Sequence, residues 1–418
     1  MYRNYVLGLL TMIACFYTLD RNVLYVTQEL VKIEFKLSDT QVGLVSGLAF
    51  GLANGLTAIP MGWLSDRMNR AKLLSFCIII WSGMTALCAA PFNFVYLVLA
   101  RVAVGAAESG GTPISMSLLT DLYDADRRGS KMGILSAGYG AGTILSALVG
   151  SHVAATYGWR AVFLLYGLPG VLLGFLMLAT LREPPRNLPP THTHVSAKSI
   201  PGAIWHLLTQ PGLRVIYLGT ALSSMISSGV ASWWASFMMR VHHMEITTVG
   251  IVSTMSLGVC SMLGMLGAGY AADWARRRHP GGALIVMGVA TVINLMSATL
   301  AIWTPNAAAM IFALCIFGAT VSAYLAPRGA ALSEFAPIHL RGIAFTLPIV
   351  ITSLIGNAIG SITIGIISDV ATTTVHEVEP LRIAMFSVIL LQIPVAAMYF
   401  TSATHMTRRM NFLAAGRI

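Results

Sequence analysis

Apolar stretches of about twenty residues recur along the whole chain, separated by short polar segments that carry most of the charges. As a helix, each stretch is long enough to cross a hydrocarbon core about 30 Å thick. These runs are too long and too uniform for the alternating strands of a membrane-spanning barrel. The pattern predicts an all-α membrane protein with twelve spans, at residues 4–31, 40–63, 72–92, 94–122, 130–156, 160–181, 212–240, 247–272, 282–303, 306–333, 342–370 and 381–403.

A single long polar stretch divides the spans into two groups of six. The segment "LREPPRNLPPTHTHVSAKSIPG" (181–202) contains several prolines and charges, which exclude a membrane span. It predicts an N-terminal six-helix bundle at 1–181, a cytoplasmic linker at 182–211 and a C-terminal six-helix bundle at 212–418. A short interfacial helix is expected at 203–212.

The two groups of spans resemble each other. "GWLSDRMNRAK" (62–72) after the second span matches "GYAADWARRRH" (269–279) after the eighth, and "DRRGSKMGIL" (126–135) matches "HLRGIAFTLP" (339–348). Parallel repeats of this kind are typical of transporters that bind their substrate near the bilayer midplane, between two pseudo-symmetric bundles.

Composition and charge exclude the other broad classes. Only 10% of the residues are charged and 56% are hydrophobic, with a mean hydropathy of +0.75. A water-soluble surface cannot be built from these residues. The net charge of +10 comes from basic residues spread between the spans, which is a topology signal rather than a nucleic-acid surface.

The loop charges predict the orientation. Basic residues concentrate in alternate loops, in the linker and at the end of the chain, whereas the opposite loops are short or acidic. We therefore expect a multi-pass protein of the bacterial inner membrane with both termini in the cytoplasm. The first apolar segment is too long for a signal-peptide core and is expected to be a retained span.

In the first half of the chain, four ionisable residues lie well inside predicted spans. Asp20 and Arg21 are adjacent in the first span, and Arg101 and Glu108 are seven residues apart in the fourth, so these last two point the same way. At about 1.5 Å per residue, the first pair and Arg101 lie at similar depth, with Glu108 about two turns deeper. Adjacent residues diverge by about 100° on a helix, so Asp20 and Arg21 need partners elsewhere, which the fourth span offers.

Two structural interpretations compete with a functional one for these charges. They could form an ion-pair network that fixes helix register, or the arginines could extend to the outer face. Intramembrane ionisable groups are nevertheless most often functional. We expect Asp20 and Glu108 to be proton carriers, with Arg21 and Arg101 as tuning partners and anion binders.

The second half contains fewer charges. Arg328 is its one clear mid-span charge, and Tyr324 and Asn357 are polar residues that could contact a substrate. One charged half and one largely apolar half suit an amphipathic substrate. The expected substrate-binding residues are Arg21, Arg101, Glu108, Tyr324, Arg328 and Asn357.

Cofactor and metal chemistry has little support in the sequence. The five cysteines lie in apolar runs without metal-ligand spacing, and the "THTH" run (191–194) has no further ligands near it. No nucleophile–base pair or phosphate loop indicates an enzyme. We expect no cofactor, no metal, no nucleic-acid partner and a monomer that contacts membrane lipids, a substrate and protons.

"GWLSDRMNRAKLL" resembles the signature that follows the second span in the major facilitator superfamily. The resemblance implies that these charged residues form a cytoplasmic gate, whereas on charge alone they could simply set topology. The glycine would allow close helix approach. The implied gate residues are Gly62, Asp66, Arg67, Arg70, Asp121, Arg127, Arg128, Gly269 and Asp273.

Three segments narrow the resemblance to one branch of that family. "YTLDRNVLYV" (17–26), "RVAVGAAESGGTPIS" (101–115) and "YGWRAVFLLYGLPG" (157–170) are similar to the spinster-like branch. The resemblance implies a proton-coupled secondary transporter of a lysolipid or sphingoid lipid, and it implies that Asp20, Arg21, Arg101 and Glu108 form the coupling cluster. Symporters of sugar acids and small organic anions share a similar "LDR" and are the alternative.

Overall fold

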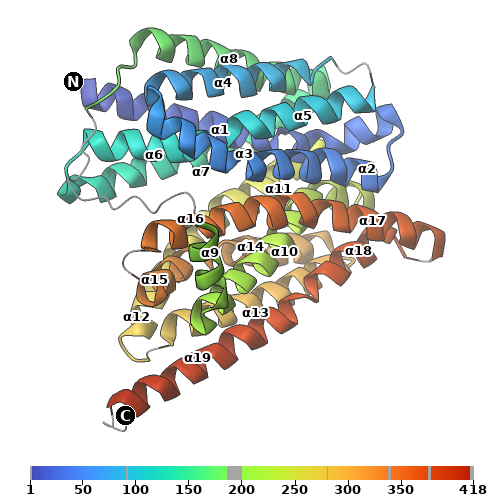
Figure 1. Ribbon diagram of the computed structural model, residues 1–418. Coiled ribbons are helices and arrows are strands. Elements are labelled where there is room, and N and C mark those ends of the chain that lie inside the picture. The colour runs from blue at the N-terminus through green and yellow to red at the C-terminus, as the bar shows by residue number, and fades with distance from the viewer. Residues whose placement is uncertain are drawn as a thin grey trace. The chain divides into compact units, whose positions relative to one another are not determined.

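The computed structural model describes residues 2–90, 93–185, 200–279, 281–337, 340–374 and 378–414, which are almost entirely helical (Figure 1). The chain divides into two compact units. Unit 1 comprises residues 1–192 and 232–254, and unit 2 comprises 193–231 and 255–418. The expected all-helical fold is confirmed, whereas the domain boundaries at 181 and 212 describe the sequence repeats and stay a prediction.

Unit 1 is built from paired long helices. α1 packs along α7, α4 along α8, and α3 along α5. Its core contains apolar side chains from α1, α4, α6 and α8, with Trp81 fully buried among them. Its helices are α1 (Tyr2–Phe35), α2 (Asp39–Gly43), α3 (Ala49–Arg67), α4 (Arg70–Leu87), α5 (Phe94–Glu108), α6 (Gly111–Leu122), α7 (Ala125–Tyr157), α8 (Trp159–Thr180) and α11 (Ile246–Ser253).

Unit 2 has a comparable arrangement. α13 packs against α14 and α19, and α17 packs against α18. α10 (Pro211–Val241) begins in unit 2 and ends in unit 1. The remaining helices are α9 (Ile200–Thr209), α12 (Ser261–Arg276), α13 (Gly282–Trp303), α14 (Ala307–Val321), α15 (Leu325–Phe335), α16 (Arg341–Ile351), α17 (Ala358–Thr374), α18 (Pro380–Ile389) and α19 (Gln392–Ala414).

The helical segments account for the predicted spans. Eleven of them, counted over the described residues, are long and apolar enough to cross a membrane. The predicted span 306–333 is divided instead into α14, of 15 residues, and α15, with a break at residues 322–324. The span 94–122 has a matching break at residues 109–110, between α5 and α6. The predicted short helix at 203–212 is α9.

Backbone details repeat between the two halves of the sequence. Lys36 and His243, in the loops after α1 and α10, are the non-glycine residues with positive φ in the described chain, at 52° and 51°. π-helical turns lie at Leu44–Leu48 and Thr254–Cys260, after α2 and α11. L-residues rarely adopt positive φ, so its recurrence at corresponding loops supports the internal repeat.

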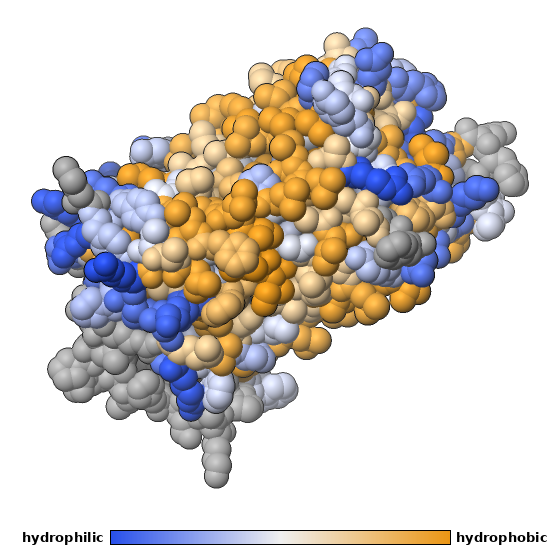
Figure 2. Space-filling view, turned by 90° about the horizontal axis from the view of Figure 1, so that it is seen from above, coloured by the Kyte–Doolittle hydropathy of each residue, from blue (hydrophilic) through white to orange (hydrophobic). Residues whose placement is uncertain are grey.

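The surface carries many large apolar side chains. Leu56, Ile59 and Leu172 are each more than 60% exposed. In the face shown in Figure 2, hydrophobic residues fill the centre and hydrophilic residues gather toward the two ends. An exposed apolar surface of this extent is stable in a bilayer rather than in water.

Candidate functional site: a buried charge cluster in unit 1

The four intramembrane charges of the first and fourth spans lie together in the interior of unit 1. Asp20 and Arg101 are fully buried, Glu108 is 1% exposed, and Arg21 is half-buried. Asp20 and Arg21 are adjacent residues of α1. Arg101 and Glu108 belong to α5, and Glu108 is its last residue. Four charged groups away from water cost free energy unless each is compensated.

Asp20 is held by α4 and α5. The Ser82 hydroxyl donates a hydrogen bond of 3.0 Å to Asp20 Oδ2, and Arg101 Nη1 lies 3.4 Å from the Asp20 backbone oxygen, to which it donates. Asp20 Oδ1 has no hydrogen-bond partner in the described part of the chain. One carboxyl oxygen is therefore fixed and the other is unsatisfied.

Phe50 lies close to both arginines. The guanidinium carbon of Arg21 is 5.5 Å from the centre of the Phe50 ring, and that of Arg101 is 5.1 Å from it. A cation over an aromatic face is stabilised by the ring quadrupole, and more so when desolvated. Phe50 was not predicted from the sequence, because one phenylalanine in an apolar run carries no signal of its contacts.

Glu108 is the more isolated of the two acids. Neither of its carboxyl oxygens has a hydrogen-bond donor among the residues that the structure describes. The four charged side chains all lie in the described chain, and no ion pair within 4 Å joins them. Arg101 nevertheless interacts electrostatically with both acids, and Arg21 with Glu108. Arg101 thus interacts with both acids, whereas Arg21 acts on Glu108, so the four groups form one cluster.

A close helix crossing fixes the position of Phe50. A Cβ added to Gly105 would lie 2.4 Å from the Phe50 backbone oxygen. Asn54 Nδ2 also donates a hydrogen bond of 3.1 Å to the Gly105 backbone oxygen. Only glycine permits α3 and α5 to approach so closely, so the ring beside both guanidinium groups is set by the backbone.

We expect Gly105→Ala to separate α3 from α5 and to displace Phe50 from the arginines. Overpacking of this kind costs about 1–3 kcal/mol of stability. Transport and melting temperature should both fall. Gly8→Ala is the control, because a Cβ at Gly8 in α1 would meet nothing within 4 Å. Wild-type transport and stability in Gly105→Ala would contradict the role of this crossing.

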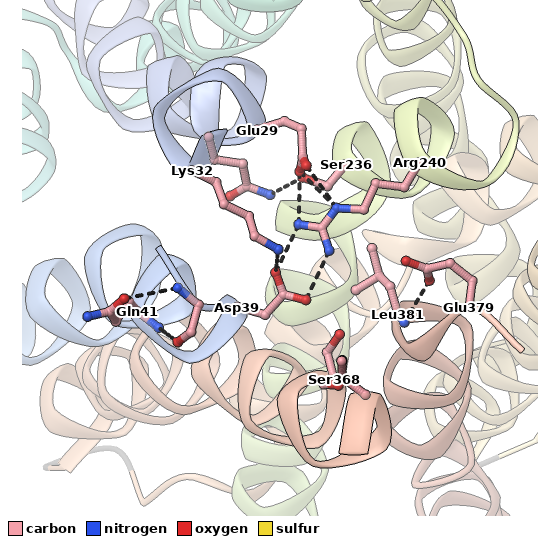
Figure 3. A network of polar contacts seen from close by, with 12 residues as sticks. Glu29, Lys32, Asp39, Gln41, Ser236, Arg240, Ser368, Glu379 and Leu381 are labelled. Atoms are coloured by element: carbon pink, nitrogen blue, oxygen red, sulfur yellow. Dashed lines mark hydrogen bonds and ion pairs between the residues drawn. The ribbon is translucent and has the colours of Figure 1, made fainter. Parts of the chain in front are cut away.

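A second ionic cluster lies near the carboxyl end of α1 (Figure 3). Arg240 of α10 donates hydrogen bonds of 2.9–3.0 Å to Glu29 of α1 and to Asp39 of α2. Lys32 also pairs with Asp39. We call Glu29, Lys32, Asp39 and Arg240 the α1–α10 ion cluster. In the sequence these residues are ordinary charges near the ends of predicted spans. Their contacts depend on the fold, which brings Arg240 to the two acids.

Two residues of the predicted cytoplasmic gate, Arg70 and Asp121, pair directly. Arg70 forms ion pairs of 2.6 Å with Asp121 and 2.7 Å with Glu183. These two contacts tie α4 to α6 and to the segment after α8, all within unit 1. The Arg67 guanidinium stacks 4.0 Å from the Trp63 ring. Asp66 is exposed.

The other predicted gate residues occupy exposed or half-buried positions. Arg128 Nε donates to the Tyr123 backbone oxygen at 2.9 Å, and Arg127 and Asp273 are exposed. Gly269 lies in α12. The expected close helix approach at Gly62 is not observed, because a Cβ there would meet nothing within 4 Å. The linker histidines at 191–194 lie outside the described residues.

In unit 2, the three predicted substrate contacts are polar side chains in largely buried positions. Tyr324, at the break between α14 and α15, is 9% exposed, and the Arg328 guanidinium lies 5.7 Å from its ring. Asn357 ends a π-helical turn, is 3% exposed, and its Oδ1 has no partner among the described residues.

Unit 2 also contains a buried polar cluster that the sequence did not predict. Asn294 Nδ2 donates to Thr320 Oγ1 at 2.8 Å, and Gln392 Nε2 donates to Asn294 Oδ1 at 2.6 Å. Asn294 and Gln392 are each 5% exposed. These polar residues occur singly in three apolar spans, so the sequence pattern does not reveal that they meet.

Comparisons with known proteins agree with this architecture. A family model described as Major Facilitator Superfamily matches residues 10–361. A crystal structure of a bacterial homologue of the human lysosomal transporter Spinster, inward-facing and unoccupied, matches with a TM-score of 0.86 at 26% identity over 98% of each chain.

Curated relatives are similar over most of their length. An MFS-type efflux pump of Mycolicibacterium smegmatis is 25% identical over 96% of this chain and 92% of its own length. A probable galactarate/D-glucarate transporter of Escherichia coli is 24% identical over 89% of this chain and 88% of its own length. The chain therefore belongs to the Major Facilitator Superfamily, and it is a multi-pass membrane transporter rather than an enzyme, similar to the bacterial Spinster homologue.

Proposed function

We propose that this member of the Major Facilitator Superfamily is a proton-coupled transporter that moves an amphipathic lipid-like anion, such as a lysolipid or sphingoid lipid, by alternating access. The observation that carries the proposal is the buried cluster of two acids and two arginines in unit 1, in which three carboxyl oxygens lack a donor among the described residues. Ionisable groups inside a membrane are costly to retain without a function.

Of the two acids, Glu108 is the better candidate for proton exchange. An unpartnered carboxylate loses no hydrogen bond when it binds a proton, and the protonated form gains a donor. Asp20 has one unpartnered oxygen as well, but its Oδ2 accepts from Ser82 and its backbone oxygen accepts from Arg101, so Asp20 is already engaged with its neighbours. We therefore assign proton exchange to Glu108 and assign to Asp20 the positioning of Arg101.

The two arginines provide the anion-binding groups. Arg101 Nε and Nη2 have no hydrogen-bond partners in the described chain, so they are free to bind oxygen atoms of an anionic head group. A proton on Glu108 would remove the negative charge that competes with an anion for Arg21, so proton binding would favour anion binding and couple the two movements. In unit 2, we propose Tyr324, Arg328 and Asn357 as further substrate contacts.

Alternating access requires contacts that form and break at each end of the transporter. We propose that the residues around Arg70 and the repeated motif at Asp273 act at the cytoplasmic end. We further propose that the α1–α10 ion cluster acts at the outer end, since it joins helices of the first and second sequence repeats. The topology would then place both termini in the cytoplasm of a monomeric inner-membrane protein.

Symport of a small organic anion or sugar acid is the second candidate function. Its support is the similarity to a probable galactarate/D-glucarate transporter over most of both chains. The same arginines would bind a sugar-acid carboxylate.

Transport in proteoliposomes distinguishes the two candidates. We expect saturable transport of a fluorescent lysolipid that depends on an imposed pH gradient, with no comparable transport of D-galactarate. Transport of galactarate alone would reject the lipid proposal in favour of the second candidate. Lysolipid transport that ignores the pH gradient would reject proton coupling and leave the substrate class standing.

A further inference from the structure

Unit 2 contains a small polar pocket of which the proposed mechanism uses only Tyr324. It encloses about 30 Å³. The polar residues that line it come from α10, α13, α14, α19 and the break before α15, and they are Ser223, Ser227, Thr291, Asn294, Thr320, Tyr324 and Gln392. Asn294, Gln392 and Tyr324 are buried, whereas the serines and threonines, whose side chains we call the wall hydroxyls, are half-buried.

The orientation of both amides follows from their contacts. The Phe317 backbone oxygen can only accept, so it must face Asn294 Nδ2, at 3.1 Å. Asn294 Oδ1 therefore faces Gln392 and accepts from its Nε2. This leaves Gln392 Oε1 as a buried acceptor with no donor among the described residues, on a side chain that lines the pocket.

The wall hydroxyls also present acceptors. Thr291 donates its proton to the Met287 backbone oxygen at 2.8 Å, and Ser227 donates to the Ser224 backbone oxygen at 3.3 Å. Their remaining lone pairs can only accept. The Tyr324 hydroxyl also lines the pocket and interacts with Ser227, and the remaining polar groups are mainly acceptors, complementary to a group that donates hydrogen bonds.

The internal repeat relates this pocket to the buried charge cluster of unit 1. When the first residues of α11 and α2 are aligned in sequence, Ser227 corresponds to Asp20. When α13 and α4 are aligned through their N-cap residues, Asn294 corresponds to Ser82. The contact that holds the acid in unit 1 thus corresponds to the polar pocket of unit 2. At the position that corresponds to the Asp20–Ser82 contact, unit 2 therefore has neutral polar side chains and no carboxylate.

We propose that this pocket binds a neutral hydroxyl group of the transported substrate. The volume holds about two water-sized groups, at roughly 10–15 Å³ each, which fits a terminal hydroxyl or diol. A cationic ligand is disfavoured because the charge of Arg328 acts on Tyr324, which also lines the pocket. The inference rests on the proposed transport function and adds that the substrate carries a hydroxylated end.

Binding measurements with matched pairs of probes test the assignment. The first pair is lysophosphatidylglycerol and its analogue with a phosphopropanol head group, and the second is galactarate and adipate. A buried acceptor left unsatisfied costs about 1–3 kcal/mol, so the wild type should prefer the hydroxylated member of a pair by roughly 5- to 150-fold. Gln392→Leu should remove the preference without weakening the deoxy probe.

Thr291→Val provides a milder test, because the threonine proton is already used within its own helix. We expect a smaller loss of preference. Thr401→Val is the matched control: Thr401 is exposed on α19 and makes the same type of bond, at 2.8 Å to the Ala397 backbone oxygen. It should leave the preference unchanged.

The outcomes separate this assignment from the proposed function. If lysolipid binds and is transported without any preference between the paired probes, the assignment fails and the transport proposal stands. A preference that survives Gln392→Leu also rejects this pocket. If none of the four probes binds, the assignment and the proposed substrate classes are rejected together.

Discussion

Glu108→Gln is expected to reduce pH-driven accumulation of substrate in proteoliposomes to the level of protein-free vesicles. Glutamine keeps the size of the side chain and resembles the protonated acid, but it cannot exchange a proton. Substrate exchange between the two sides at equal pH should persist, because that reaction needs no net proton movement. The two assays together distinguish a proton site from a folding defect.

The matched control is Glu245→Gln, which makes the same substitution at an exposed residue at the start of α11. It should leave both assays unchanged. Wild-type pH-driven accumulation in Glu108→Gln would contradict the proton assignment. Loss of exchange together with accumulation would assign Glu108 to substrate binding instead.

Asp20→Asn separates the roles of the two acids. The asparagine side chain can still accept from Ser82 through its amide oxygen, but it carries no charge toward Arg101. If Asp20 positions Arg101, substrate affinity should fall and the remaining transport should still respond to the pH gradient. Loss of the pH response with unchanged affinity would instead identify Asp20 as the proton carrier.

Arg240→Met is expected to have the largest effect on stability. Arg240 donates five hydrogen bonds to Glu29 and Asp39, and its side chain is only 16% exposed. Removing it leaves two largely buried carboxylates with Lys32 as the remaining cation of the cluster. Breaking a buried pair on one side costs about 3–5 kcal/mol, so the melting temperature in detergent should fall clearly.

Loss of the α1–α10 ion cluster should loosen the protein locally, near the residues that form the cluster. In Arg240→Met, amide hydrogen exchange should increase at residues 29–43 and 232–241 before it increases elsewhere in the protein. Arg160→Met is the control, because Arg160 and Glu34 form an exposed pair, with side chains 45% and 42% exposed. Such a pair contributes about 0–1 kcal/mol. If the two substitutions lower the melting temperature equally, the buried α1–α10 ion cluster contributes no more to stability than the exposed pair.

The sequence alone determined the architecture, because the membrane imposes a simple rule on it. Every span must be a long apolar helix, and the repeated motifs at Asp66 and Asp273 mark the internal duplication. The same rule made Asp20, Arg21, Arg101 and Glu108 conspicuous, since charges within apolar runs are rare. Their expected meeting in one bundle is observed.

Only the tertiary structure decided which groups contact one another. Phe50 lies beside both arginines because Gly105 permits a close crossing, and Arg240 reaches Glu29 and Asp39 from a distant helix. Single polar residues such as Asn294 and Gln392 leave no periodic trace in apolar spans. Helical periodicity records which face a residue occupies, whereas its partners depend on how separate helices pack, and that is set by the whole fold.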